Sequence, residues 1–151
     1  MNSNSKGRIM NDKFTAEARI TIHSPASNVW DALTKPELIK QYLFASDVIS
    51  DWKVGSPITY KGEWQGKPFE DKGEILKVEP EKILVSTHWS PLSGVPYTPE
   101  NSHTVTYKLN GNGDSTEVTI IQDNNANEKE KAESEQNWRT VLEGMKKLLE
   151  S

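Results

Sequence analysis

Between Asp47 and Asp123 the sequence contains only strand-like segments, which are separated by turns and loops. Short runs of alternating polarity that end at glycine, proline or asparagine are typical of β-strands. Because no helical segment lies between these strands, consecutive strands are expected to be joined by hairpins, and the sheet is predicted to be antiparallel. One face of such a sheet needs an apolar cover.

The long helical pattern near the C-terminus can supply that cover. Apolar side chains recur there at helical spacing, at Trp138, Val141, Leu142, Met145, Leu148 and Leu149. This spacing predicts an amphipathic helix from about Glu130 to Glu150. Asn127 and Glu130 have the spacing of a capping box, which supports a helix start at this point.

The segment before these strands is predicted to hold a tail, a strand and two short helices. Residues 1–12 are polar and are expected to be a disordered tail, and residues 13–151 are expected to form one domain. The alternating segment "FTAEARITI" predicts a strand. Ser24-Pro25 and Thr34-Lys35-Pro36-Glu37 read as two separate helix starts, the second with capping-box spacing. Two such helices would close one end of the sheet, with Trp30 as a structural residue.

Composition and charge argue against several classes of function. The formal net charge is −4 and no basic stripe is present, so a nucleic-acid partner is not expected. The chain has no cysteine, which excludes disulfides and thiolate metal sites. No apolar run approaches the roughly 20 residues that a membrane span needs. Because a signal-peptide pattern is also missing, the cytoplasm is the expected location.

Five segments resemble a known family: "VWDALTKPELIKQYL", "VGSPITY", "KGEILKVEPEKILVSTHW", "STEVTI" and "NWRTVLEGMKKLLE". Together with the order of elements, they make the sequence similar to the START/SRPBCC superfamily, which includes the birch-pollen allergen fold. More narrowly, the sequence resembles the family of activators of heat-shock protein 90 ATPase. Family members commonly have Trp-Trp after the second helix, where this chain reads Gln41-Tyr42-Leu43, and a paired glycine where it has Gly55-Ser56.

This resemblance implies an α+β helix-grip fold, in which a curved antiparallel sheet of six to seven strands wraps around the C-terminal helix. Relatives use the cavity between sheet and helix for sterols, lipids, polyketides, plant hormones and aromatic metabolites. We therefore expect a protein that binds a hydrophobic small molecule, lipid-like or aromatic, without a cofactor. Two alternatives stay open, because fold does not decide function. One is a chaperone-associated module that stimulates the heat-shock protein 90 ATPase, and the other is a cyclase or hydrolase acting on a polyketide-like substrate.

Side chains on the predicted inward faces are the candidate ligand-binding residues. They are Tyr60, Trp64, His88, Trp89, His103, Tyr107, Trp138, Leu142 and Met145. A ligand cavity needs an apolar lining with a few polar groups that orient the ligand. The inward face of strand 82–89 is ambiguous, because apolar alternation favours Trp89 whereas the resemblance favours His88. A shift of one residue would exchange the two.

His88 and His103 flank the loop from Ser90 to Ser102, at the ends of two predicted hairpin partners. Two imidazoles at one pocket could bind a metal or move a proton. A metal site normally needs a third ligand, and only Glu100 is a possibility nearby, so no metal site is expected. No catalytic residue is assigned, although His88 would be the best candidate in an enzyme. The proline-containing loop reads equally as a lid or as an irregular connection.

Two further expectations concern the segment between residues 63 and 74. "GKPF" is expected to form the connection between two strands. The acidic side chains of this region are predicted to point mostly outward; they are Glu63, Glu70, Asp71 and Glu74. No buried pair of carboxylates is therefore expected for acid–base chemistry.

Overall fold

The computed structural model describes residues 14–43 and 47–151, and in this part of the chain seven strands form one antiparallel sheet. The predicted tail, residues 1–12, lies outside the described residues. The strand order is β1-β7-β6-β5-β4-β3-β2. The strands are β1 (Ala16–Ile22), β2 (Asp47–Ser50), β3 (Pro57–Trp64), β4 (Lys67–Glu79), β5 (Ile83–His88), β6 (His103–Asn112) and β7 (Ser115–Gln122).

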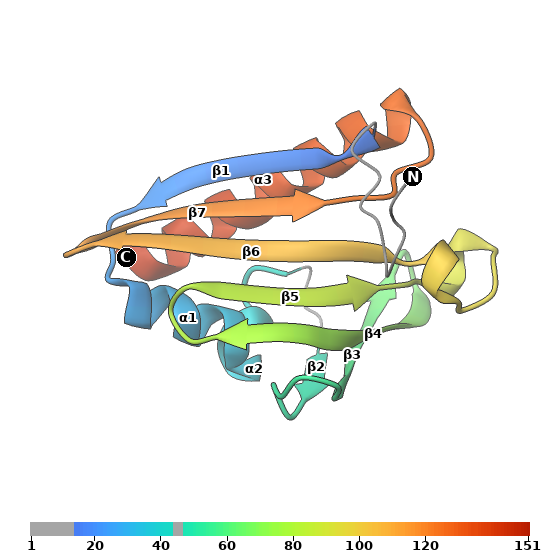
Figure 1. Cartoon of the computed structure of the whole chain (residues 1–151), viewed down its shortest axis with the longest axis horizontal. Coiled ribbons are helices and arrows are strands. Elements are labelled where there is room, and N and C mark those ends of the chain that lie inside the picture. The colour runs from blue at the N-terminus through green and yellow to red at the C-terminus, as the bar shows by residue number, and fades with distance from the viewer. Residues whose placement is uncertain (1–13, 44–46) are drawn as a thin grey trace, which may run out of the picture.

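The helices cover one face and one end of the sheet. They are α1 (Ala26–Thr34), α2 (Pro36–Ile39) and α3 (Glu128–Glu150), with the short 3-10 helices η3 (Pro91–Ser93) and η4 (Pro99–Asn101) in the loop after β5. Figure 1 shows α3 running behind the sheet, with α1 and α2 at one end and the loop of η3 and η4 at the other. This is the predicted helix-grip arrangement. None of the described helices has the length and apolar character of a membrane span.

The core lies between the sheet and α3. From the helix, Val141, Leu142 and Met145 are buried, and from the strands Ile75 and Ile120 are fully buried. The predicted start of α3 is also confirmed. The side chain of Asn127 accepts a hydrogen bond from the backbone N–H of Glu130 at 2.9 Å.

Pro36 separates α1 from α2 as predicted, but the caps differ from the prediction. Thr34 does not cap α2, because its hydroxyl donates to the carbonyl of Trp30 at 2.9 Å and so belongs to the last turn of α1. Lys35 has φ −102° and ψ 116°, the extended conformation that a residue before proline prefers. The N-cap of α1 is Pro25 rather than Ser24.

The connection between β3 and β4 is shorter than predicted. The turn consists of Gln65 and Gly66, with φ values of 51° and 81°. Two consecutive positive φ values suit the twist of a two-residue hairpin, so β4 begins directly at Lys67. Phe69 and Asp71 therefore lie in a strand, on the same face as the buried Ile75. The prediction that Asp71 points outward is thus wrong.

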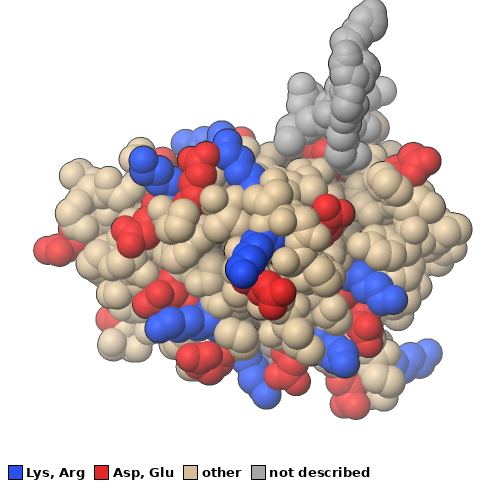
Figure 2. Space-filling view, turned by 60° about the horizontal axis from the view of Figure 1, so that its bottom comes forward, with Lys and Arg blue, Asp and Glu red and all other residues tan. Residues whose placement is uncertain are grey.

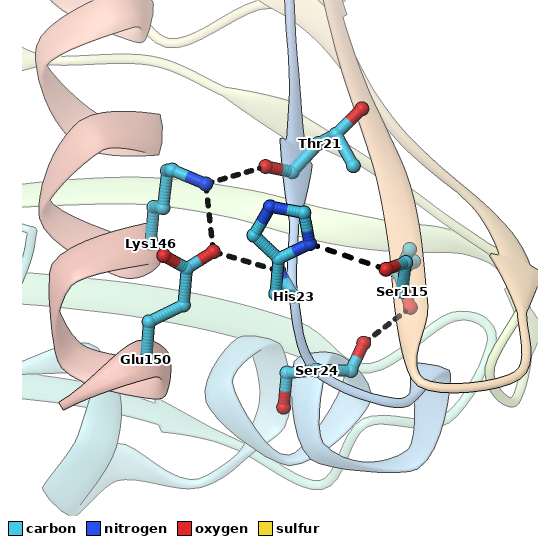
Figure 3. A network of polar contacts seen from close by, with 7 residues as sticks. Thr21, His23, Ser24, Ser115, Lys146 and Glu150 are labelled. Carbon is cyan, nitrogen blue, oxygen red and sulfur yellow. Dashed lines mark hydrogen bonds and ion pairs between the residues drawn. The ribbon is translucent and has the colours of Figure 1, made fainter.

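Side chains of α3 cover the outer edge of β1 by binding main-chain groups of this strand and of His23, which directly follows it. The pairs are Glu135 with the N–H of Glu17 (3.1 Å), Lys146 with the carbonyl of Thr21 (2.9 Å) and Glu150 with the N–H of His23 (2.7 Å). Figure 3 shows the two pairs nearest the end of the helix. An exposed edge strand would offer these groups to another chain. These side chains therefore both hold α3 on the sheet and occupy the edge of β1.

We expect Glu150→Gln to lower the midpoint of urea unfolding at pH 7, with a smaller effect in acid. The hydrogen bond from the His23 N–H and that from Lys146 lower the pKa of Glu150 from its usual 4.5. A lowered pKa stabilises the fold above pH 4.5, and this contribution is lost as the pH falls through the folded-state value. Glu143→Gln, at an exposed position of the same helix, is the matched control. A difference between Glu150→Gln and wild type that stays constant down to pH 3 would contradict this assignment.

Candidate ligand-binding site

A cavity of about 420 Å³ lies between the sheet and α3. Its volume falls within the range of about 300–1,000 Å³ that is common for small-molecule sites. The lining comes from the strands β3 to β7, from α3 and from the loops at Leu43 and Leu92. The lining residues are Leu43, Tyr60, Glu63, Phe69, Asp71, His88, Leu92, His103, Val105, Tyr107, Gln122, Ser134, Asn137, Trp138 and Val141.

The structure brings five of the nine candidate residues to this cavity, namely Tyr60, His88, His103, Tyr107 and Trp138. Leu142 and Met145 do not line it, because both are packed in the core with at most 1% of their surface exposed. Trp89 does not line it either. The side chain of Trp64 lies outside the described part of the structure.

The register of β5 places His88, and not Trp89, toward the cavity. Leu84 and Ser86 are buried on the same face as His88. Trp89 lies on the other face, where its ring stacks on Tyr97 with centroids 5.0 Å apart. Apolar alternation was misleading here because the inward position 86 is a serine. The Ser86 side chain is hydrogen-bonded to the Tyr60 side chain, which satisfies both polar groups inside the protein.

Asp71 and His88 form a close pair in the lining of the cavity. The distance from His88 Nε2 to Asp71 Oδ2 is 2.8 Å. The Tyr60 ring meets the imidazole edge-on, with centroids 5.6 Å apart. Burial, and to a lesser extent the Asp71 charge, raises the pKa of Tyr60 to about 12 against the opposing hydrogen bond with Ser86. Tyr60 therefore stays a neutral phenol at physiological pH.

The second oxygen of the Asp71 carboxylate, Oδ1, is buried and has no hydrogen-bond partner in the described part of the chain. Buried polar atoms are normally paired, so an orphan oxygen at a cavity marks a place where a further donor would be stabilising. The sequence contained a signal for Asp71. It is two residues from Gly73 and four from Ile75, and period-two alternation puts all three side-chain positions on one face.

His103 is the direct cross-strand partner of His88, and both side chains line the cavity. The distance from His103 Nδ1 to the carbonyl oxygen of Asp123 is 2.8 Å, which holds the ring in one orientation. The pairing confirms that β5 and β6 are hairpin partners. Among the described residues, no group of three or more histidine or acidic side chains is arranged to hold a metal ion.

Trp138 is held at the α3 side of the cavity by a polar network. Its indole N–H donates to Gln122 Oε1 at 2.8 Å, and the Gln122 amide donates to Asn125 and Ser134. The Tyr107 ring packs edge-to-face on the indole, with centroids 5.9 Å apart and an interplanar angle of 89°. Burial raises the pKa of Tyr107 well above its usual value, so this phenol is neutral as well.

A curved antiparallel sheet, a long C-terminal helix and an aromatic cavity between them define a helix-grip protein with a candidate small-molecule site. Residues 23–150 match the family model described as "Activator of Hsp90 ATPase homolog 1-like protein". The chain belongs to this family. No curated protein sequence matches it.

Several solved structures share the fold. The solution structure of ChR145 from Cytophaga hutchinsonii is 50% identical, has a TM-score of 0.81, and the match covers 93% of this chain and 97% of that one. CalU16 from Micromonospora echinospora is 23% identical with a TM-score of 0.64, covering 84% and 70% of the two chains. The Aha1 dimer from Colwellia psychrerythraea is 20% identical with a TM-score of 0.68, covering 89% and 95%. The last two show likeness of fold alone.

Proposed function

We propose that this protein binds a hydrophobic small molecule, aromatic or lipid-like, in the cavity between the sheet and α3. The observation that carries this proposal is a cavity of about 420 Å³ whose lining surface is largely apolar and also presents several polar side chains. Sites of this composition bury most of a ligand's surface and use the polar groups to orient it.

The polar and aromatic groups of the cavity are already held in place by the protein. His88 is paired with Asp71, His103 with a backbone carbonyl, and Trp138 with Gln122. A ligand would therefore not have to order these side chains on binding, which reduces the entropic cost of association. This pre-organisation supports a binding site over a cavity left by imperfect packing.

The surface gives less support to the alternative of a chaperone-associated module. Figure 2 shows acidic and basic side chains interspersed over the face drawn, without a continuous patch of one sign. The loop after β5 exposes Leu92, Val95 and Tyr97. Of these, only Leu92 lines the cavity, and we interpret it as part of the rim where a hydrophobic ligand would enter. Tyr97 packs instead on Trp89, and the Trp89 indole N–H donates to the Val95 carbonyl.

Titrating the protein with lipids, sterols and aromatic compounds while recording tryptophan fluorescence tests this function. We expect a saturable change for at least one compound class, and we expect Trp138→Phe to remove most of it, since the Trp138 ring lines the cavity. Trp89→Phe is the matched control, because Trp89 lies on the other face of β5. If no compound class gives a saturable change, the proposal fails.

A further inference from the structure

We propose that the polar end of the cavity, formed by Asp71, His88 and His103, selects uncharged ligands that carry a hydroxyl group over carboxylates and over molecules without a donor. This inference rests on the proposed function and specifies the ligand class. It follows from the partners that these three side chains already have.

The hydrogen bond of His103 determines which of its nitrogens is left for a ligand. The carbonyl oxygen of Asp123 can only accept a hydrogen bond, so His103 Nδ1 must carry the hydrogen. In a neutral imidazole the other nitrogen then has a lone pair and no hydrogen. His103 Nε2 is therefore a hydrogen-bond acceptor.

The same reasoning applies to His88. An ionised carboxylate accepts hydrogen bonds and donates none, so His88 Nε2 carries the hydrogen that is shared with Asp71 Oδ2. Nδ1 of the neutral ring is the nitrogen that remains, and it too is an acceptor. Because His88 and His103 are cross-strand partners, both acceptors belong to the same end of the cavity.

Asp71 adds a third acceptor, since its buried Oδ1 finds no donor in the described residues. The donor groups of two lining residues are used inside the protein. The indole N–H of Trp138 goes to Gln122, and the amide N–H groups of Gln122 go to Asn125 and Ser134. The polar end formed by Asp71, His88 and His103 thus offers three acceptors, while the N–H groups of its two histidines are already used.

An excess of acceptors discriminates between ligand head groups. A hydroxyl group can donate to one of the free nitrogens or to Asp71, whereas an ether of the same shape leaves them unpaired, which costs free energy in a buried site. A carboxylate brings a negative charge and further lone pairs toward Asp71, so like-charge repulsion rejects it. The fitting ligand is an aromatic or alicyclic molecule with a neutral hydroxyl, and a fatty-acid carboxylate is disfavoured.

Three probes with the same naphthalene ring and different substituents test this selectivity: 2-naphthol, 2-methoxynaphthalene and 2-naphthoate. Affinities would be measured by calorimetry and by backbone amide shifts at pH 8, where an ordinary imidazole is neutral. We expect 2-naphthol to bind about tenfold more tightly than the methyl ether, which corresponds to one well-formed hydrogen bond in a buried site. We expect 2-naphthoate to bind more weakly than both.

A double variant, Asp71→Leu with His88→Phe, removes the charge and two of the three acceptors together, so no buried charge is left unpaired. We expect its preference for 2-naphthol over the methyl ether to fall to within about threefold, the remainder coming from His103. His23→Phe is the matched control, because His23 is exposed and does not line the cavity, and it should keep the full preference. If the double variant does not fold, the order of the three probe affinities for the wild-type protein tests the selectivity.

The outcomes separate this inference from the proposed function. Equal affinities for 2-naphthol and its methyl ether, or tighter binding of 2-naphthoate, would overturn the selectivity and leave a hydrophobic binding protein. If the double variant keeps the tenfold preference for 2-naphthol, Asp71 and His88 do not determine the selectivity. If none of the three probes binds at millimolar concentration, the selectivity is overturned, whereas the proposed function fails only if the lipids, sterols and aromatic compounds of the fluorescence titration also give no saturable change.

Discussion

Replacing Gly73 with alanine is expected to lower the free energy of unfolding by about 3 kcal/mol or more. An added Cβ at this position would lie 1.8 Å from the carbonyl oxygen of Thr87 and 2.7 Å from its carbonyl carbon. Both atoms belong to the backbone of β5, so relief requires the two strands to move apart. Urea unfolding at pH 7 measures the effect.

Gly94→Ala is the matched control for this substitution. Gly94 has φ +79°, but no atom lies within 4 Å of an added Cβ. Its expected cost is only that of a left-handed conformation for alanine, about 1 kcal/mol. If both variants lose the same stability, the close approach of β4 and β5 at Gly73 is not the cause. The strand movement that relieves the clash in Gly73→Ala is also expected to disturb the nearby pair of Asp71 and His88.

Leu142→Ala is expected to lower the free energy of unfolding by about 2–5 kcal/mol, the usual cost of truncating a fully buried leucine. Only 1% of the Leu142 surface is exposed, and the side chain belongs to the core beneath the sheet. Because it does not line the cavity, the affinity for a cavity ligand should change little. Denaturant unfolding and a ligand titration on the same variant check both statements.

Leu92→Ala is expected to show the opposite behaviour. Leu92 is 62% exposed, so its truncation should leave stability nearly unchanged. It lines the cavity, and its loss should weaken the binding of a hydrophobic ligand. If Leu142→Ala lowers the affinity for the cavity ligand without lowering the free energy of unfolding, Leu142 is a ligand-binding residue, as the sequence pattern predicts.

Helical spacing alone did not separate the core from the cavity on α3. Trp138 and Leu142 are one turn apart on the same helix, and both were predicted to face a ligand. The structure places Trp138 at the cavity and Leu142 in the core. The difference depends on what lies opposite each residue, and α3 crosses several strands, so a local pattern contains no information on it.

The ambiguous inward face of β5 has a different physical cause. A strand buries one of two faces, and alternation decides between them only if the inward residues are the more apolar ones. In β5 the inward set includes Ser86 and His88, which are hydrogen-bonded to Tyr60 and Asp71. Internal hydrogen bonds therefore allowed a polar face to be the buried one.

The amino-acid sequence by itself determined the order of the elements, the antiparallel sheet, the break at Pro36 and the amphipathic character of α3. These depend on local properties: side-chain periodicity, the restricted backbone of proline, and the absence of helices between strands. Only the tertiary structure decided that Asp71 meets His88, that His103 bonds a backbone carbonyl, and that their remaining nitrogens are acceptors. Such pairings join residues 17 and 20 positions apart in the chain, so they exist only once the strands are in register.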